Sequence, residues 1–471
     1  MRKKLFKRVI CVALIATMAT TMITGCGSGS GKKDDGKTVL SLGIWPSDDL
    51  VDDIAMFEGY SETFGESHPD VTVEPKHYTY ATDTFVSLAE SGNCPTIFET
   101  WFTEPQKLIN QGLVADITDQ LKERGWDTQM NQSILDILSD EEGRIYGVAR
   151  DAYALGVMCN VELFEEAGLV DANGVPIFPK TWDELAQTAK KIKDKTGAAG
   201  FCLLAKDNSG GWHFSNLAWC FGATLCVDNG DGTYTSNLNS AEAVAAMKYV
   251  YDLKWKYDVL TADPTSEDWT SGFQQIGTGA CAMYIAANDA VNQPTQVFGL
   301  DATKLAMCAI PAGPNGDQYS LSGGTPYMFA KDATAEEISA ALDYLEVMGK
   351  TPEVNDTLRM GLQQDAANRQ ANGVPVLKSF PCWNNQERTD AEAQVIAEYQ
   401  NVDPKMFDSY FETTAKEGNL RTEEPGDAQK MYEQLTNVIQ AVVTDKDCNI
   451  EELMKTANDN YQKILDSKFT K

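Results

Sequence analysis

The sequence lacks the side chains and patterns on which most metal and nucleophilic chemistry depends. Its 471 residues include three histidines and no Cys-x-x-Cys pair, which argues against a zinc site built on histidine and cysteine. Nothing in it resembles a Ser-His-Asp set or a glycine-rich phosphate loop. We therefore expect no catalytic residues, no metal and no cofactor.

Positive charge is also scarce. Lysine and arginine number 39 against 69 aspartates and glutamates, so the formal net charge is −30. The first 26 residues contribute five basic residues and no acidic one, which leaves −35 for the remainder. A surface this acidic repels nucleic acid and anionic lipid head groups, and it is typical of a protein that stays soluble outside the cell.

The amino terminus is apolar but too short for a membrane anchor. Residues 9–23 form the apolar run, whereas a transmembrane helix needs about 20 residues. Basic residues precede the run and Thr24-Gly25-Cys26 follows it, which is the pattern of an export signal. Residues 23–26 resemble the lipobox of bacterial lipoproteins, although Ile23 stands where leucine is most common.

The lipobox resemblance implies a processed and lipidated protein. Residues 1–26 would be a lipoprotein signal peptide, and Cys26 would receive diacylglycerol and palmitate chains, which together anchor stably. Residues 27–37 are rich in Gly, Ser, Lys and Asp, so we expect a flexible tether at the extracellular face of the cell membrane. The alternative is an ordinary cleaved signal with a chance cysteine.

Eleven cysteines are many for an exported protein. Cys11 would leave with the signal and Cys26 would be lipidated, so nine remain, an odd number that cannot all pair. Most have apolar neighbours, as in Phe201-Cys202-Leu203 and Trp219-Cys220-Phe221. We expect buried free thiols that pack as small hydrophobic side chains, and no disulfide framework.

The length and the periodicity predict two α/β lobes. A chain of 471 residues exceeds what one core normally fills. Strands predicted at 38–44, 71–75 and 96–98 alternate with helical patterns, which favours a parallel sheet. Ligands bind beyond the carboxyl ends of such strands, so Trp45 and Trp101 are predicted to lie on the same rim.

Residues 147–160 are predicted to carry the chain between the lobes. Two short apolar runs flank Arg150 and Asp151, and neither has the period of a helix, so we expect two strands with a polar crossing between them. A second crossing is predicted after residue 286 and a third within 317–331. The amino-terminal lobe would comprise residues 38–149 and 286–322, and the carboxyl-terminal lobe residues 150–285 and 323–471, with a helical final portion.

Two polar segments have distinct predictions. Residues 207–214 are rich in glycine and are expected to form a flexible loop that presents Trp212 and His213. Residues 228–233 (DNGDGT) are similar to part of a calcium loop but lack the glutamate at its twelfth position. We predict a hairpin turn there.

Several short motifs in order resemble the extracellular solute-binding proteins of ABC importers, family 1, the maltose-binding-like group that takes up sugars. Each motif is weak alone, but their order extends over roughly residues 38 to 350. The motifs are residues 96–101 (TIFETW), 112–117 (GLVADI), 143–148 (GRIYGV), 179–185 (PKTWDEL), 279–283 (GACAM), 310–314 (IPAGP) and 323–324 (GG). The resemblance implies a two-lobed periplasmic-binding-protein-like fold of class II type with three interlobe crossings. It also implies a carbohydrate ligand such as an oligosaccharide, an ABC permease as partner, and a monomer.

The resemblance also implies where the solute binds. A sugar has flat C–H faces and a rim of hydroxyl groups, which suit aromatic rings and Asp, Asn, Glu or Arg side chains. The loop near Arg421, which precedes a carboxyl-terminal helix, is the predicted site segment least similar to the family. Trp383 is an additional candidate. The expected ligand-binding residues are Trp45, Asp48, Glu99, Trp101, Asp151, Tyr153, Trp212, His213, Asn288, Asp289, Trp383 and Arg421.

Each of these assignments has an alternative. The tryptophans at 45, 101 and 212 could pack in cores, as we expect for those at 182, 219 and 255, and His213 could be a solvated loop residue. Asp48 also suits the negative charge favoured at a helix N-terminus.

The same fold could bind a cationic solute such as a polyamine, or report occupancy to a membrane kinase. An exported glycosidase would need two carboxyls that face each other about 5 to 10 Å apart across a cleft.

Overall fold

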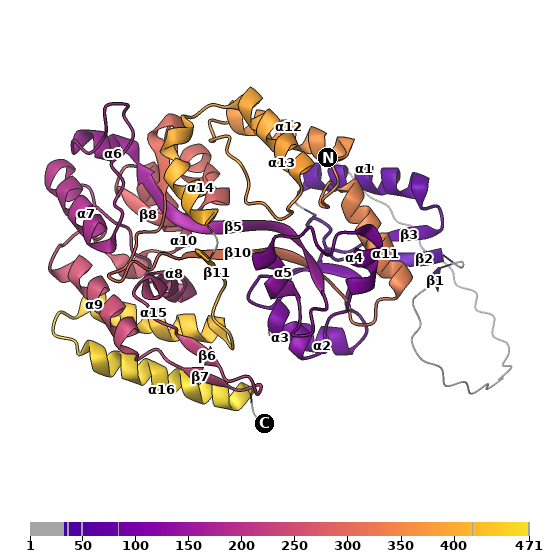
Figure 1. The fold of residues 1–471 in the computed structure, drawn as a ribbon, viewed down its shortest axis with the longest axis horizontal. Coiled ribbons are helices and arrows are strands. Elements are labelled where there is room, and N and C mark those ends of the chain that lie inside the picture. The colour runs from indigo at the N-terminus through magenta and orange to yellow at the C-terminus, as the bar shows by residue number, and fades with distance from the viewer. Residues whose placement is uncertain (1–32, 35–36, 49, 83, 417, 470–471) are drawn as a thin grey trace, which may run out of the picture.

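The computed structural model describes residues 33–34, 37–48, 50–82, 84–416 and 418–469, which form two lobes joined by one long sheet (Figure 1). The predicted signal peptide and Cys26 lie outside the described residues. At the end of the predicted tether, β1 (Lys33–Asp34) pairs antiparallel with the start of β2 (Lys37–Leu42). No helix in these described ranges is both long enough and apolar enough to cross a bilayer.

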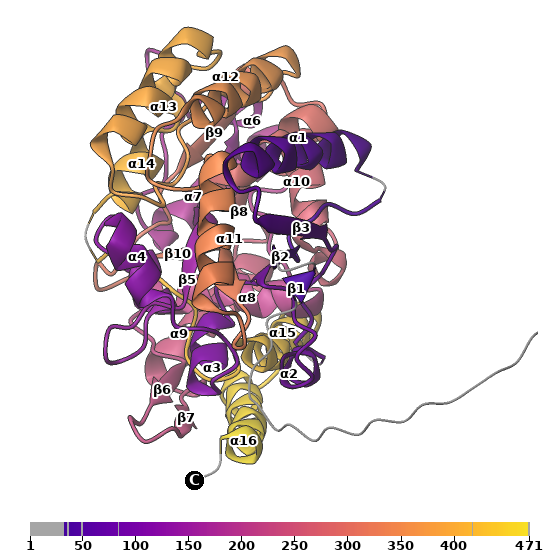
Figure 2. The ribbon, with the colours of Figure 1, turned by 90° about the vertical axis from the view of Figure 1, so that its right-hand side faces the viewer.

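The amino-terminal lobe begins as predicted, with a parallel sheet. β2 lies between β3 (Val71–Pro75) and β4 (Ile97–Glu99) and is parallel to both. On the sheet, α1 and α11 pack side by side (Figure 2), and the hydroxyls of Ser61 and Tyr344 lie 3.0 Å apart. The helices of this lobe are α1 (Val51–Ser67), α2 (Phe85–Glu90), α3 (Pro105–Asn110), α4 (Thr118–Arg124), α5 (Gln132–Leu138) and α11 (Ala335–Val347).

A single strand carries the chain out of this lobe. The two strands predicted around Arg150 and Asp151 form one strand, β5 (Gly147–Asn160), whose Ala149 packs in the amino-terminal core and whose Leu155 packs in the other core. The polar pair does not interrupt the strand, because β10 (Ser320–Phe329) runs antiparallel beside it and pairs with the backbone on both sides. The first and third predicted crossings are therefore confirmed as neighbouring strands.

The predicted second crossing is wrong. β8 (Met283–Ala287) pairs with the carboxyl-lobe half of β5, and the chain after it buries Val291 and Leu305 in the same lobe. The polar residues after β8 end a strand, but the next apolar segment folds back onto the core it came from. Residues 286–322 therefore belong to the carboxyl-terminal lobe, and Tyr327 to Met348 pack in the amino-terminal one.

The chain passes between the lobes again after α11. Helices α12 (Asp356–Ala371) and α13 (Gln386–Tyr399) lie above the joining strands in Figure 1. Beyond them, Val402 and Phe407 pack in the carboxyl-terminal core. This last passage lies in the part of the sequence that is least similar to the family.

The carboxyl-terminal lobe surrounds the far halves of β5 and β10. The predicted hairpin turn is confirmed between β6 (Cys226–Asp228) and β7 (Tyr234–Ser236), which pair antiparallel. The nine cysteines of the described residues are free and buried or half-buried, as predicted. The lobe's other elements are α6 (Val161–Glu166), α7 (Trp182–Thr196), α8 (Asp207–Cys220), α9 (Ala241–Trp255), α10 (Trp269–Gly277), β9 (Leu305–Cys308), α14 (Asp408–Thr414), β11 (Leu420–Arg421), α15 (Ala428–Thr444) and α16 (Ile450–Lys468).

The flexible loop predicted at 207–214 is the start of helix α8. A Cβ on Gly211 would lie 2.2 Å from the backbone oxygen of Tyr432 on α15, so only glycine allows the two helices to approach this closely. The Gly211 N–H donates to the Thr436 hydroxyl at 2.8 Å. Gly210 and Gly211, which suggested flexibility, thus form a surface for helix packing. The tertiary contact outweighs the low helix propensity of glycine.

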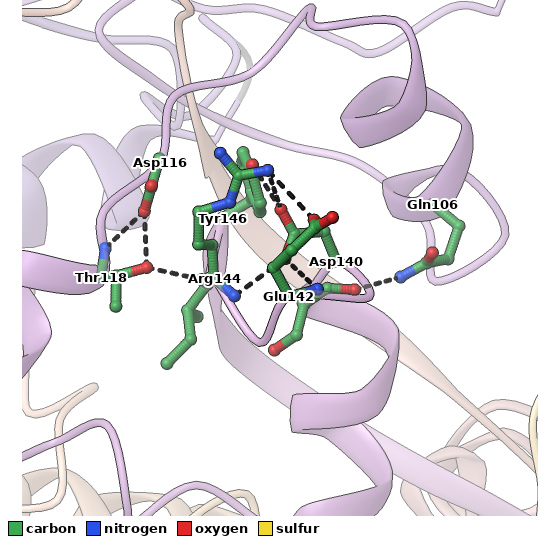
Figure 3. Close-up of polar contacts among 9 residues, drawn as sticks. Gln106, Asp116, Thr118, Asp140, Glu142, Arg144 and Tyr146 are labelled. Atoms are coloured by element: carbon green, nitrogen blue, oxygen red, sulfur yellow. Dashed lines mark hydrogen bonds and ion pairs between the residues drawn. The ribbon is translucent and has the colours of Figure 1, made fainter.

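A polar network holds the turn that leads into β5 (Figure 3). Asp140 accepts hydrogen bonds from the backbone N–H of Arg144 at 2.9 Å and from the Tyr146 hydroxyl at 2.9 Å. The Thr118 hydroxyl accepts one from the Ile145 N–H at 2.7 Å. The start of the crossing strand is therefore fixed to the body of the amino-terminal lobe.

Candidate functional site at the junction of the lobes

Two adjoining hollows lie at the junction, and both are lined by Trp101 and Thr325. The larger, here called the wide cleft, has a volume of about 1020 Å³ and runs from the Trp45 and Glu99 loops to helices α12 and α13. The smaller, here called the interlobe pocket, has a volume of about 330 Å³. Its walls are Trp101, Tyr153, Trp212, Gly323, Glu423 and Tyr432.

The predicted tryptophans at 45, 101 and 212 all lie at these hollows. Trp101 follows β4 in the amino-terminal lobe and is 48% exposed, with its ring 5.6 Å from that of Tyr80. Trp212 projects from α8 in the carboxyl-terminal lobe and meets Tyr153 edge-on at 6.5 Å. Trp45 is half-buried in the wall of the wide cleft. Trp212 packs against the carboxyl-terminal core and Trp101 is an exposed residue of the amino-terminal lobe, yet both line one pocket, so core packing alone does not explain them.

Arg150 binds two of the predicted carboxylates, Glu99 and Asp151. Its Nη1 donates to Glu99 at 2.7 Å, and its Nε donates to Asp151 at 2.6 Å. Its Nη2 donates to the Thr325 hydroxyl at 3.2 Å, and the Thr325 N–H donates to the other oxygen of Asp151 at 3.2 Å. Glu99 and Asp151 therefore line the wide cleft as one charged group with Arg150 at its centre.

The charge balance of this group follows from partial burial. Burial raises the pKa of Glu99, and the Arg150 guanidinium offsets part of that rise. Burial alone would lower the pKa of Arg150, but the carboxylates of Asp151 and Glu99 raise it above its ordinary value. Arg150 therefore stays charged, and the oxygens that it leaves free can accept hydrogen bonds from a solute.

Two glycines bring β10 close to the pocket. A Cβ on Gly323 would lie 2.3 Å from the Tyr153 hydroxyl, and one on Gly324 would lie 2.4 Å from the backbone oxygen of Asp151. No side chain fits at either position without moving β5 or the Tyr153 ring. The Gly-Gly motif therefore fixes Tyr153 in the wall of the interlobe pocket.

His213 is not at the site. It is 3% exposed and packs against Trp269 and Tyr284, with ring centroids 5.9 and 5.7 Å away. Burial lowers its pKa to about 3, so the ring is neutral. The predicted contact with a solute is wrong, because residues 207–214 are helical and neighbouring side chains on a helix point in different directions, Trp212 to the pocket and His213 to the core.

The residues after β8 also differ from the prediction. Asn288 is 6% exposed, and its Oδ1 accepts hydrogen bonds from the Tyr410 hydroxyl at 2.8 Å and the Ala154 N–H at 3.3 Å. It therefore holds β5 in place and does not reach a solute. Asp289 has an exposed side chain that lines neither hollow. Nearby protein still excludes enough water to raise its pKa to about 6, and the charge of Asp151 adds to this.

Of the last three predicted contacts, one reaches a hollow and two do not. Trp383 is 3% exposed in the amino-terminal core, although its edge reaches the wide cleft. Arg421 is stacked between Trp219 and Tyr319, 4.8 and 5.0 Å from their ring centroids, and lines neither hollow. Asp48 is exposed outside both hollows, which is consistent with its alternative role near a helix N-terminus.

Sequence reasoning missed the residues that the last third of the chain supplies. Glu423 and Tyr432 line the interlobe pocket, and Lys350 and Arg388 line the wide cleft. Burial lowers the pKa of Lys350, although Asp151 acts to raise it. Glu423 lies only two residues after the predicted Arg421, but no local pattern separates it from Glu424, which is buried and accepts a hydrogen bond from the Trp219 indole at 2.7 Å.

The described residues hold no group of three or more His, Cys, Asp or Glu side chains placed to bind a metal ion. The two hollows offer aromatic rings, carboxylates and three basic side chains, Arg150, Lys350 and Arg388, which suit the recognition of a solute.

Comparison with known proteins agrees with this picture. Residues 48–352 match the model of the family described as bacterial extracellular solute-binding protein. A protein of Brucella abortus, provisionally named as a binding protein, is 28% identical over 301 residues, 61% of this chain and 68% of that one.

Solved structures share the fold over almost the whole chain. The cyclic alpha-maltosyl-1,6-maltose binding protein of Arthrobacter globiformis superposes with a TM-score of 0.66 at 19% identity, covering 90% of this chain and 97% of that one. UgpB of Mycobacterium tuberculosis, in complex with glycerophosphocholine, also gives 0.66, at 16% identity, covering 90% and 98%. The same two-lobed architecture thus holds solutes of different chemistry in different proteins.

Proposed function

The chain belongs to the bacterial extracellular solute-binding proteins, and from that premise we propose that it captures a carbohydrate between its lobes for an ABC importer. The family and the solved neighbours are binding proteins. In this proposal the solute stabilises a closed arrangement of the lobes, which the membrane permease recognises. A lipid on Cys26 would keep the protein at the outer face of the membrane.

One observation carries the proposal: Trp101 and Trp212, from separate lobes, line the same pocket. Aromatic rings suit the C–H faces of a sugar ring. Glu99 and Asp151 stand beside them in the wide cleft and can accept hydrogen bonds from hydroxyl groups. A solute that touches both lobes is favoured in the closed state, because only that state makes all its contacts.

Hydrolysis has less support. Glu99 and Asp151 both bind Arg150 on one wall of the wide cleft, so they do not face each other across a bond to be cleaved.

A glycan panel tests the proposal. The full chain with Cys26→Ser is screened by thermal shift against mono- and oligosaccharides, since a bound solute raises the melting temperature. For the best glycan, Trp101→Ala is expected to weaken binding roughly tenfold, about 1.4 kcal/mol, with little loss of stability because the ring is half exposed. Trp255→Phe, at a position that lines neither hollow, should leave affinity unchanged. If no glycan shifts the melting temperature, the carbohydrate proposal fails.

A further inference from the structure

We infer that the interlobe pocket binds a positively charged nitrogen of the solute, which makes an ammonium-bearing carbohydrate, such as an amino sugar, the preferred class. The carbohydrate part of this statement rests on the proposed function. The charge part rests on the walls of the pocket alone.

Five aromatic side chains line the pocket, and Phe102 is one of them. Trp101 comes from the amino-terminal lobe, Tyr153 from the crossing strand, and Trp212 and Tyr432 from helices of the carboxyl-terminal lobe. Tyr153 and Trp212 meet edge-on, and Tyr432 is 1% exposed. The face of an aromatic ring attracts a cation, and several such rings around a small space are the arrangement that binds ammonium groups.

A carboxylate without a cation completes the pocket. Glu423 forms no ion pair with any basic side chain of the described residues, and no Lys, Arg or His lines the interlobe pocket. Arg421, two residues before it, is held between Trp219 and Tyr319, and Arg150 is held by Glu99 and Asp151. The pocket therefore has a negative group whose counterion the protein does not supply.

The surroundings of Glu423 strengthen this assignment. Burial raises its pKa to about 7, the nearby Tyr432 and Trp212 act to lower it, and the Glu104 carboxylate adds to the rise. A carboxylate that is half-buried, as Glu423 is, and lacks a counterion is costly, and a bound cation relieves that cost. The net charge of −30 also raises the local concentration of cationic solutes.

Matched sugars test the inference. Each set keeps one sugar and varies only the C2 substituent: hydroxyl, ammonium or N-acetyl. Calorimetry on the full chain with Cys26→Ser is expected to show the ammonium form binding at least tenfold tighter than the other two. Glu423→Gln should remove that preference while keeping the affinity for the neutral forms. Glu433→Gln, an exposed neighbour on α15 outside the pocket, is the matched control and should change nothing.

Choline, whose charge does not titrate, gives a second readout. Its affinity should fall as pH drops from 8.5 to 5.5, because Glu423 gains a proton near pH 7, and Glu423→Gln should flatten the profile. The other titratable groups facing Glu423 are Tyr153, Tyr432 and Glu104. Burial raises the pKa of both tyrosines, so they stay neutral here. Glu104 is paired with Lys107 at 3.1 Å.

The outcomes separate the two proposals. Equal or tighter binding of the neutral sugars, or a preference that survives Glu423→Gln, overturns the charged pocket and leaves the carbohydrate proposal standing. Binding of choline that depends on Glu423, with no glycan bound, supports the charged pocket and overturns the carbohydrate proposal. If neither ammonium sugars nor choline bind more tightly than their neutral analogues, the inference is wrong.

Discussion

Arg150 sets the charge balance at the junction of the lobes. It is the one basic side chain that binds both Glu99 and Asp151 within the described residues, and all three are partly exposed, at 29 to 46%. Solvent therefore screens part of the attraction. The arginine nonetheless opposes the rise in the pKa of Glu99 that burial causes.

Replacing this arginine should couple stability to pH. Arg150→Met keeps most of the side-chain volume but leaves Glu99 without a counterion, so we expect a loss of about 1 to 2 kcal/mol at pH 7.5. A carboxyl whose folded pKa lies above its unfolded value takes up protons more readily in the folded state. The loss should therefore shrink as pH falls through the raised pKa of Glu99. Thermal unfolding of the unchanged and Arg150→Met proteins between pH 4.5 and 7.5 measures the loss of stability. A loss that stays constant across that range contradicts the role assigned to Arg150.

Helix α8 depends on its glycines for packing. Gly211 lies against the backbone of Tyr432 on α15, so this contact both joins two helices of the core and sets the wall of the interlobe pocket. The same helix directs Trp212 and His213 to different environments. Helix α8, whose start the local sequence predicts to be a loop, thus positions Trp212 and the wall of the interlobe pocket.

Gly211→Ala separates helix propensity from packing. Propensity alone would favour alanine by about 1 kcal/mol. Because the new Cβ would lie 2.2 Å from a backbone oxygen, we expect the variant instead to be less stable, by about 1 to 3 kcal/mol. Gly65→Ala on α1, where a Cβ would meet nothing within 4 Å, is the control and should gain about 0.5 kcal/mol. Urea unfolding compares them, and equal effects of the two substitutions would show that α8 and α15 are not closely packed.

The whole molecule is organised around two neighbouring strands that both lobes share. β5 and β10 run from one core into the other, and the interlobe pocket lies where they pass between them. A solute bound there touches the loop after β4 on one side and α8, α15 and Glu423 on the other. Binding energy is therefore distributed over both lobes.

Amide hydrogen exchange tests this distribution. At a solute concentration 100 times Kd, binding stabilises the bound state by about 2.7 kcal/mol. We expect slower exchange in both lobes together: in residues 99–105 of the amino-terminal lobe and in residues 207–214 and 423–432 of the carboxyl-terminal lobe. Segments 161–166 and 450–468, which line neither hollow, serve as internal controls. Protection confined to one lobe would mean that the solute does not bridge them.

Features of the fold that depend on local pattern can be read from the residues alone. The parallel start of the sheet, the crossings at Arg150 and at the Gly-Gly motif, the hairpin turn and the free cysteines all follow from periodicity, turn chemistry or composition. The tryptophans at 45, 101 and 212 were predictable as site candidates because they follow strands or stand in a polar segment.

Contacts between segments that are far apart in the chain cannot be predicted from local pattern. Whether the chain crosses after β8, and whether glycine at 211 means a loop or a helix contact, depends on a partner far away in sequence. The same holds for Glu423, whose neighbours Glu424 and Arg421 are equally polar but are turned toward Trp219. A side chain lines the site only if the segments packed around it leave it facing the pocket. Those segments come from both lobes.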